Sequence, residues 1–131
     1  MTAEQTAKVE ALCRRYLDAI ERGGPADFDA LFAEDATATS PLSGPQPAGV
    51  FYRNVLRITS DRSTVLRNVL VATAGPRHVA VHFDYTRTVR GGRPGTIECV
   101  DLFELTADLD RFASVRIIYD IAPVRTDFDD K

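Results

Sequence analysis

The chain contains 131 residues with a formal net charge of -3, and 44% of the residues are hydrophobic and 27% charged. This mixture is typical of a single globular domain, here residues 1–131, which is long enough to fold without metal or disulfide cross-links. The acidic balance argues against nucleic-acid binding, and no apolar run reaches the ~18–20 residues of a membrane span. The first residues lack the apolar core of a signal peptide, so we expect a cytoplasmic protein in which Cys13 and Cys99 stay reduced.

The first half of the chain is dominated by helical periodicity. Residues 4–22 place apolar side chains at intervals of three and four, which predicts an amphipathic helix. A second helix is expected at 25–33, followed by a short strand at 35–40. The segment 41–47 is rich in turn residues and is expected to be irregular. Residues 48–58 favour a third short helix, although the run is also compatible with a strand.

The second half of the chain changes to the alternation typical of strands. Strands are predicted at 65–73, 77–90, 96–106 and 112–121, and the tail 126–131 is polar and expected to fray. Helices followed by antiparallel strands predict an α+β fold, with the helices on one face of a curved sheet.

Strand 77–90 is unusual because both of its faces carry side chains that need an explanation. One face carries His82 and Asp84, which lie two residues apart and therefore ~6.6 Å from each other on the same side. The next strand adds Glu98 as a further acid. The two histidines, His78 and His82, lie ~13 Å apart on such a strand, so we expect no metal site. The opposite face is apolar and comprises Val79, Val81, Phe83 and Tyr85.

Each candidate polar residue also has an ordinary structural explanation. Tyr16 lies in the apolar stripe of the first helix and, taken alone, is interpreted as a core tyrosine. Taken alone, His82 and Asp84 are interpreted as part of a solvated strand face. Glu98 is interpreted as an exposed or salt-bridged side chain, and Asp101 as a surface group. A functional interpretation requires that such residues converge on one concave apolar pocket, because titratable groups with perturbed pKa values cluster at functional sites.

Several segments of the chain match a known sequence pattern. The long segment VEALCRRYLDAIERGGPADFDALFAEDATATSPLSGP and the later FYRNVL, GGRPG and ECVDLFEL carry the match, which covers about residues 8–122. They resemble ketosteroid isomerases and SnoaL-like polyketide cyclases of the nuclear-transport-factor-two-like superfamily. The resemblance implies a cone-shaped α+β barrel, with three helices closing over a strongly curved mixed or antiparallel sheet and a deep pocket inside. It also implies a homodimer formed through the outer sheet face, which would cover the apolar side of strand 77–90.

The resemblance also implies roles for individual residues. A tyrosine on the first helix that donates to the substrate oxyanion corresponds to Tyr16, and a second acid, aligned through the GGRPG turn, corresponds to Glu98. The carboxylate base expected before the P-x-G turn falls on Ser40, which cannot shuttle a proton unaided. SnoaL-like cyclases use a carboxylate and often a histidine, so His82 and Asp84 are expected to supply the base from the pocket side.

These observations predict a cofactor-independent acid/base enzyme that acts on a small apolar carbonyl compound by isomerisation or cyclisation through an enolate. The predicted catalytic residues are Tyr16, His82, Asp84 and Glu98, and the predicted substrate contacts are Ser40, Tyr52, Val100 and Tyr119. Two alternatives stay open. One is an epoxide-opening hydrolase, because limonene epoxide hydrolases share the fold and their Arg-x-Asp pair corresponds to His82-Phe83-Asp84. The other is a dimer that binds a small molecule without catalysis, which Ser40 at the base position favours.

Overall fold

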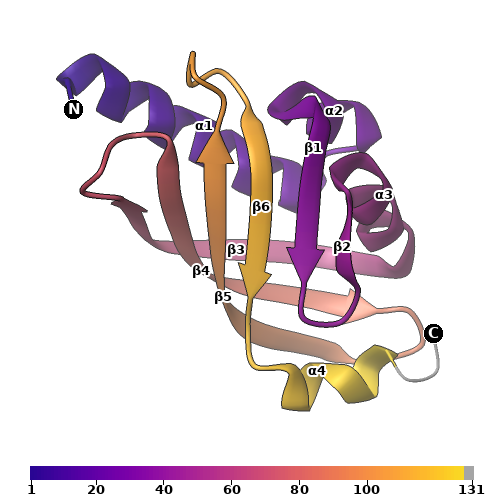
Figure 1. Ribbon diagram of the computed structural model, residues 1–131. Helices are drawn as coiled ribbons and strands as arrows, with labels where there is room; N and C mark the ends of the chain where they lie inside the picture. The colour runs from indigo at the N-terminus through magenta and orange to yellow at the C-terminus, as the bar shows by residue number, and fades with distance from the viewer. Residues whose placement is uncertain (129–131) are drawn as a thin grey trace.

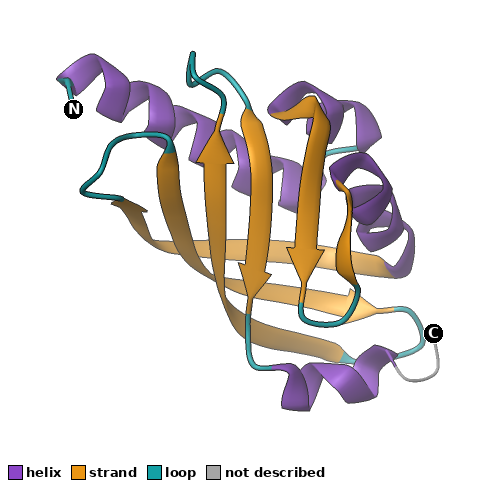
Figure 2. Ribbon diagram, viewed as in Figure 1, coloured by secondary structure: helices purple, strands orange, loops and turns teal. Residues whose placement is uncertain are grey.

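The computed structural model describes the backbone of residues 1–128 and the side chains of residues 1–124. Within that range the chain forms an α+β fold, in which helices pack on a curved, unclosed six-stranded sheet (Figures 1 and 2). The helices are α1 (Ala3–Arg22), α2 (Pro25–Leu31), α3 (Ala48–Ile58) and α4 (Ile121–Phe128). The strands are β1 (Phe32–Ser40), β2 (Gly44–Pro47), β3 (Thr59–Val71), β4 (His78–Val89), β5 (Pro94–Leu105) and β6 (Phe112–Ile118). The predicted fold class is confirmed.

The sheet has the strand order β2-β1-β6-β5-β4-β3. Its neighbours are antiparallel except for β1 and β6, which run parallel, so the sheet is mixed. The sheet curves because β4 and β5 bend: together with β3 they cross the lower half of the molecule, and their other ends stand upright beside β6 and β1, with α1 running behind (Figure 1). This curvature produces a concave side that the helices cover.

Helix α1 has the amphipathic pattern that the sequence predicts. A capping box between Thr2 and Gln5 satisfies backbone groups at its start. At its end, a Cβ atom on Gly23 would lie 2.7 Å from the carbonyl oxygen of Ala19, so only glycine fits there. Its buried stripe consists of Val9, Leu12, Cys13, Tyr16, Leu17, Ala19 and Ile20. The helix therefore presents Tyr16 to the interior of the cone.

Two predictions about local structure are wrong. Part of the segment 41–47 is regular, because Gly44–Pro47 forms the edge strand β2, in which Gly44 pairs with Ser40 of β1. Gly44 adopts a φ of 67°, which glycine tolerates, and the prolines are accommodated because an edge strand leaves backbone donors unpaired. The tail predicted at 126–131 begins inside helix α4, and residues 129–131 lie outside the described residues.

The apolar face of β4 lies on the concave side of the sheet, whereas the prediction placed it on the outer side. Val79, Val81 and Phe83 are buried on the concave side, in the core beneath the helices. A second subunit on the outer face of the sheet therefore cannot cover them. The reason is that the side of the sheet packed against α1 must be apolar, whereas the outer side remains accessible to water. The homodimer itself stays a prediction.

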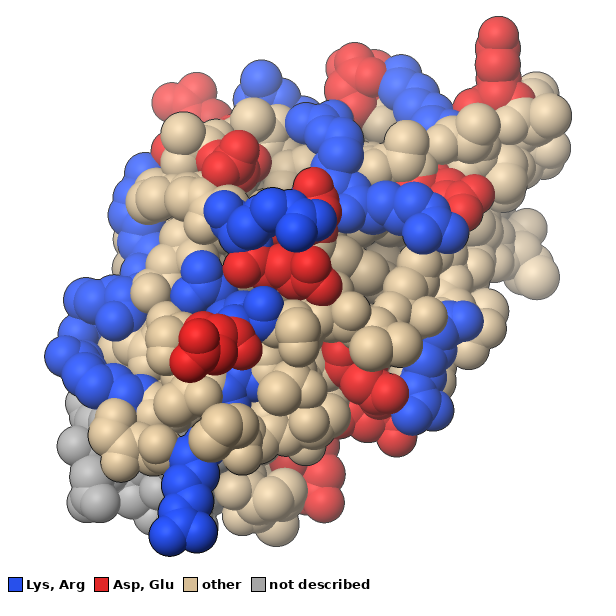
Figure 3. All heavy atoms as spheres, turned by 180° about the vertical axis from the view of Figure 1, so that it is seen from behind, with Lys and Arg blue, Asp and Glu red and all other residues tan. Residues whose placement is uncertain are grey.

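The surface carries charges of both signs. On the face seen from behind in Figure 3, acidic and basic side chains are interspersed. Within residues 1–128, no helix combines the length and apolarity needed to cross a membrane.

Candidate active site

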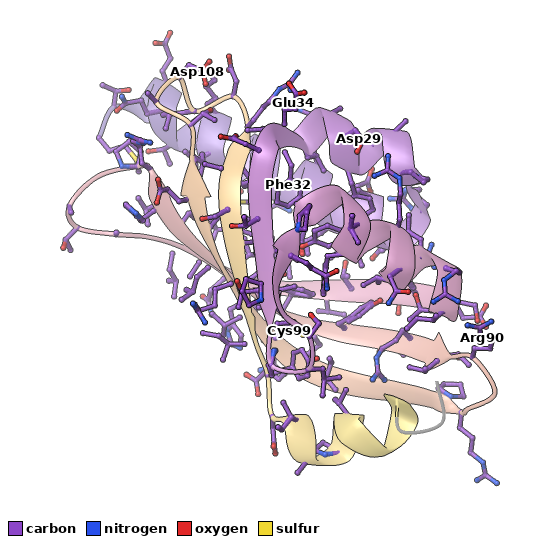
Figure 4. All side chains as sticks on the ribbon, turned by 45° about the vertical axis from the view of Figure 1, so that its right-hand side comes forward. Asp29, Phe32, Glu34, Arg90, Cys99 and Asp108 are labelled. Carbon is purple, nitrogen blue, oxygen red and sulfur yellow. The ribbon has the colours of Figure 1, made fainter. Side chains whose placement is uncertain are left out.

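A cavity of about 420 Å³ lies between the helices and the concave side of the sheet. Its volume falls within the range of about 300–1,000 Å³ that is common for small-molecule sites. Phe51, Tyr52 and Val55 of α3 line one wall, and Phe83 of β4 and Cys99 of β5 line another. Figure 4 labels Cys99, and it also marks Arg90 and Asp108 at the two opposite turns of the sheet. The walls are mostly apolar, so any polar group among them is conspicuous.

Three polar side chains from distant parts of the chain meet at this cavity. The hydroxyl of Tyr16 donates to Oδ2 of Asp101 at 2.7 Å. The hydroxyls of Tyr16 and Tyr52 are also 2.7 Å apart. Because the Tyr16 proton is directed at Asp101, the Tyr52 hydroxyl donates to the Tyr16 oxygen. The other carboxyl oxygen of Asp101, Oδ1, is buried and has no hydrogen-bond partner, so its capacity to accept a hydrogen bond is unused.

The surrounding aromatic rings hold this network rigidly. The rings of Tyr16 and Phe103 meet edge to face at 4.8 Å between centroids, and those of Phe28 and Tyr52 stack at 4.5 Å. Asp101 is only 2% exposed and lies opposite Val81 in the β4–β5 register. Packed rings of this kind fix side-chain rotamers, so the three polar groups are preorganised before a ligand arrives.

Burial shifts the acid–base behaviour of all three groups. Removal from water raises the pKa of Asp101 to about 7, although the hydrogen bond from Tyr16 acts in the opposite direction. Burial, together with the neighbouring Asp101, raises the pKa of Tyr16 and of Tyr52 well above the usual value for tyrosine. Near neutral pH both tyrosines are therefore protonated donors, whereas Asp101 populates its neutral and its ionised form.

This shift predicts that folding stability falls as the pH rises. The Asp101 carboxyl has a pKa of about 7 in the folded protein but an unperturbed pKa of 3.8, which is expected in the unfolded chain, so the folded state binds the proton more tightly. The stabilisation is present below pH ~4 and is lost as the pH rises to about 7, which reduces the free energy of unfolding by a few kcal/mol. Urea unfolding of the wild type and of Asp101→Asn between pH 4 and 8 measures the difference. Equal pH dependence in the two proteins would contradict the assignment.

Four of the predicted site residues line the cavity. They are Tyr16, Ser40, Tyr52 and Tyr119. The Ser40 side chain is 7% exposed, and its Oγ lies 2.8 Å from Oγ of Ser43 in the hairpin between β1 and β2. The position that the resemblance assigns to a base is thus at the cavity, and it holds a hydroxyl group.

The other four predicted site residues belong to the opposite face of the sheet and are absent from the cavity walls. His82 Nε2 lies 2.5 Å from Glu98 Oε2, and Asn68 contacts His82 Nδ1 at 3.1 Å. Asp84 pairs with Arg67 at 2.8 Å. Val100 lies opposite His82 in the β4–β5 register. The expectation that His82 and Asp84 face the pocket is therefore wrong, because the alternation of β4 directs them to the outer side.

The acid at the cavity is Asp101 and not Glu98, so the prediction that Asp101 is a surface group is wrong. A signal for it does exist in the sequence. Asp101 occupies the same face of β5 as Cys99 and Phe103, both of which are buried. Burying a single carboxyl group on an otherwise apolar strand face destabilises the fold, because the group loses its hydration. Such a position is therefore a candidate for a functional acid.

Comparison with known proteins places this geometry in context. A family model described as "SnoaL-like domain" matches residues 13–115. The curated "Steroid Delta-isomerase" of Nocardioides simplex is 31% identical over 103 residues, which cover 79% of this chain and 83% of that protein. Among solved structures, PrhC from Penicillium brasilianum NBRC 6234 superposes with a TM-score of 0.80 at 16% identity, covering 94% of this chain and 87% of the other. A "putative SnoaL-like polyketide cyclase" from Jannaschia sp. CCS1 has a TM-score of 0.75 at 15% identity, with coverages of 95% and 94%. The two structures share the fold with this chain.

Proposed function

The chain belongs to the SnoaL-like domain family, and we propose that it is a cofactor-independent acid/base enzyme of the isomerase or cyclase type, acting on a small apolar carbonyl compound. One observation carries the proposal. A buried carboxyl group, Asp101, faces an apolar cavity with one oxygen held by Tyr16 and the other without a partner. The similarity to a steroid isomerase supports isomerisation, and the fold shared with a putative polyketide cyclase supports cyclisation.

In the proposed mechanism Asp101 carries the proton. Its ionised form takes a proton from the carbon next to the carbonyl group through Oδ1, while Tyr16 holds Oδ2. The Tyr52 hydroxyl turns from Tyr16 to the carbonyl oxygen and stabilises the enolate that forms. Asp101 then returns the proton to another carbon of the same molecule, which completes an isomerisation. In a cyclisation the enolate carbon instead attacks a second carbonyl group, and the proton goes to the new alkoxide.

Deuterium exchange tests this proposal without knowledge of the product. The protein is incubated in D₂O with a panel of steroid ketones and polyketide-like ketones, and mass spectrometry follows incorporation at the carbons next to the carbonyl group. We expect exchange with at least one member of the panel. Tyr16→Phe removes a hydrogen bond to a charged group and should reduce the exchange rate roughly tenfold to a hundredfold. Thermal melting of this variant checks that it remains folded.

Ligand binding without exchange is the outcome that contradicts catalysis. It would favour the second candidate function, a small-molecule-binding protein that uses the same cavity. The observation behind this alternative is Ser40, whose hydroxyl occupies the cavity position where the resemblance expects a carboxylate base. Thermal shifts with the same panel distinguish the two functions, because a binding protein is stabilised by a ligand that it does not alter.

A further inference from the structure

The cavity has a second polar position, at the hydroxyl group of Tyr85 on β4. Tyr85 lines the same cavity as Asp101. Its hydroxyl oxygen is buried and makes no hydrogen bond of ordinary geometry. A buried hydroxyl without a partner is destabilising relative to one that is hydrogen-bonded, so it requires an explanation.

The strand register separates this position from Asp101. Tyr85 lies opposite Ile97 on β5, and Asp101 is four residues further along that strand. At ~3.3 Å per residue the two positions are about 13 Å apart along the sheet. Between them the cavity wall is formed by Phe83 and Cys99, both of which are buried. On this face of the sheet the cavity wall is therefore polar at Asp101 and at the end that holds Tyr85 and Arg87, and it is apolar between them.

The groups near Tyr85 donate no hydrogen bond to its hydroxyl oxygen, and the Thr59 side chain lies near it without making a hydrogen bond of ordinary geometry. The Thr59 hydroxyl donates to the carbonyl oxygen of Val55 at 2.6 Å, and Arg62 Nε donates to that of Ile20 at 2.7 Å, so these hydrogens are committed elsewhere. Burial raises the pKa of Tyr85, although the Thr59 side chain and the charges of Arg62 and Arg87 act in the opposite direction. The phenol is thus neutral at physiological pH and retains its proton.

We infer that the substrate carries a second oxygen function, a ketone or a hydroxyl group, at the end opposite to its reacting carbonyl group, and that Tyr85 binds this oxygen by a hydrogen bond. Tyr85 is then a specificity-determining residue. The inference rests on the proposed function, because it takes the Asp101 end of the cavity as the reacting end. A ligand with only one oxygen would leave the Tyr85 hydroxyl unpaired, and sites built to bind a polar group discriminate against analogues that lack it.

Two steroid probes that differ only at one end test this inference. Androst-4-ene-3,17-dione has an oxygen at each end, and androst-4-en-3-one has the same rings with one oxygen. Isothermal titration should show that the wild type binds the dione roughly threefold to tenfold more tightly, as expected for one hydrogen bond. In Tyr85→Phe the preference should disappear, through weaker binding of the dione and stronger binding of the monoketone. Thr86→Val removes a hydroxyl from the next residue of β4, whose Oγ1 bonds Thr96 outside the cavity, and should keep the preference.

Two results would overturn the inference. One is a preference that survives in Tyr85→Phe, and the other is a wild type that binds neither probe more tightly than about 1 mM, since the cavity would then not accept a ligand of this length. Deuterium exchange with the same probes separates this inference from the proposed function. If the wild type exchanges no deuterium but the preference is lost in Tyr85→Phe, the ligand class is supported and catalysis is contradicted. If the wild type exchanges deuterium but Tyr85→Phe keeps the preference, catalysis is supported and the role of Tyr85 is contradicted.

Discussion

Asp101→Asn should lower the rate of proton exchange by roughly 10²–10⁴-fold, which is the range for loss of a positioned acid/base group. Asparagine has nearly the same volume as aspartate and retains an oxygen that can accept the 2.7 Å hydrogen bond from Tyr16. It has no basic oxygen, so it cannot take a proton from carbon. Among the cavity-lining residues that the structure describes, Asp101 is the only carboxylic acid and no histidine is present, so no neighbouring side chain of that kind replaces it.

The matched control is Asp84→Asn, which changes a carboxyl group on the outer face of the sheet, where Asp84 pairs with Arg67. Exchange rates should stay near the wild-type value in this variant. The wild-type kcat/KM should rise through pH about 7 as Asp101 loses its proton, because the ionised form is the base. A variant Asp101→Asn that keeps most of its activity would show that Asp101 acts only as a hydrogen-bonding group. Loss of exchange in Asp84→Asn would show that the base lies on the outer face of the sheet.

The elements of the fold were predictable to the extent that they depend on local patterns. The α1 stripe could be identified because its side chains recur with the helical period, and β4 because its side chains alternate. The facing of β4 could not be derived in the same way. Alternation is symmetric, so it shows that two faces differ but not which of them the helices cover, and a wrong choice moves every side chain of the strand to the other side.

The site depends on contacts that no local pattern contains. Tyr16 and Asp101 are 85 residues apart in the chain and Tyr16 and Tyr52 are 36 apart, yet all three meet in one network. The resemblance assigned Tyr16 and Ser40 to the pocket, and both residues line the cavity. Alignment through the β4–β5 turn instead selected Glu98, three residues from Asp101, and an odd offset on a strand changes the face.

Ser40→Asp should raise the rate of proton exchange by about 10²-fold or more, because it adds a second carboxylate to the cavity. In the wild type Asp101 supplies the base, so it has no proton to donate to the enolate oxygen while the enolate forms. When a base is introduced at position 40, Asp101 no longer has to take the proton from carbon. The repulsion between two carboxylates in one cavity raises the pKa of Asp101 further, so that it stays neutral and donates a hydrogen bond to the enolate oxygen together with the tyrosines.

The pH profile provides the decisive measurement for this variant. With Asp101 as the base, kcat/KM rises through pH about 7, whereas in Ser40→Asp activity should begin at lower pH and decline once Asp101 loses its proton, which gives a bell shape. Ser40→Asn is the matched control, since it adds similar volume and also loses the hydrogen bond to Ser43, but it adds no charge. The double variant Ser40→Asp with Asp101→Asn should retain substantial exchange, because the asparagine amide still donates a hydrogen bond. If Ser40→Asp is folded and binds the ketone but exchanges no faster than Ser40→Asn, position 40 does not face the reacting carbon, and the substrate reacts at a different point of the cavity.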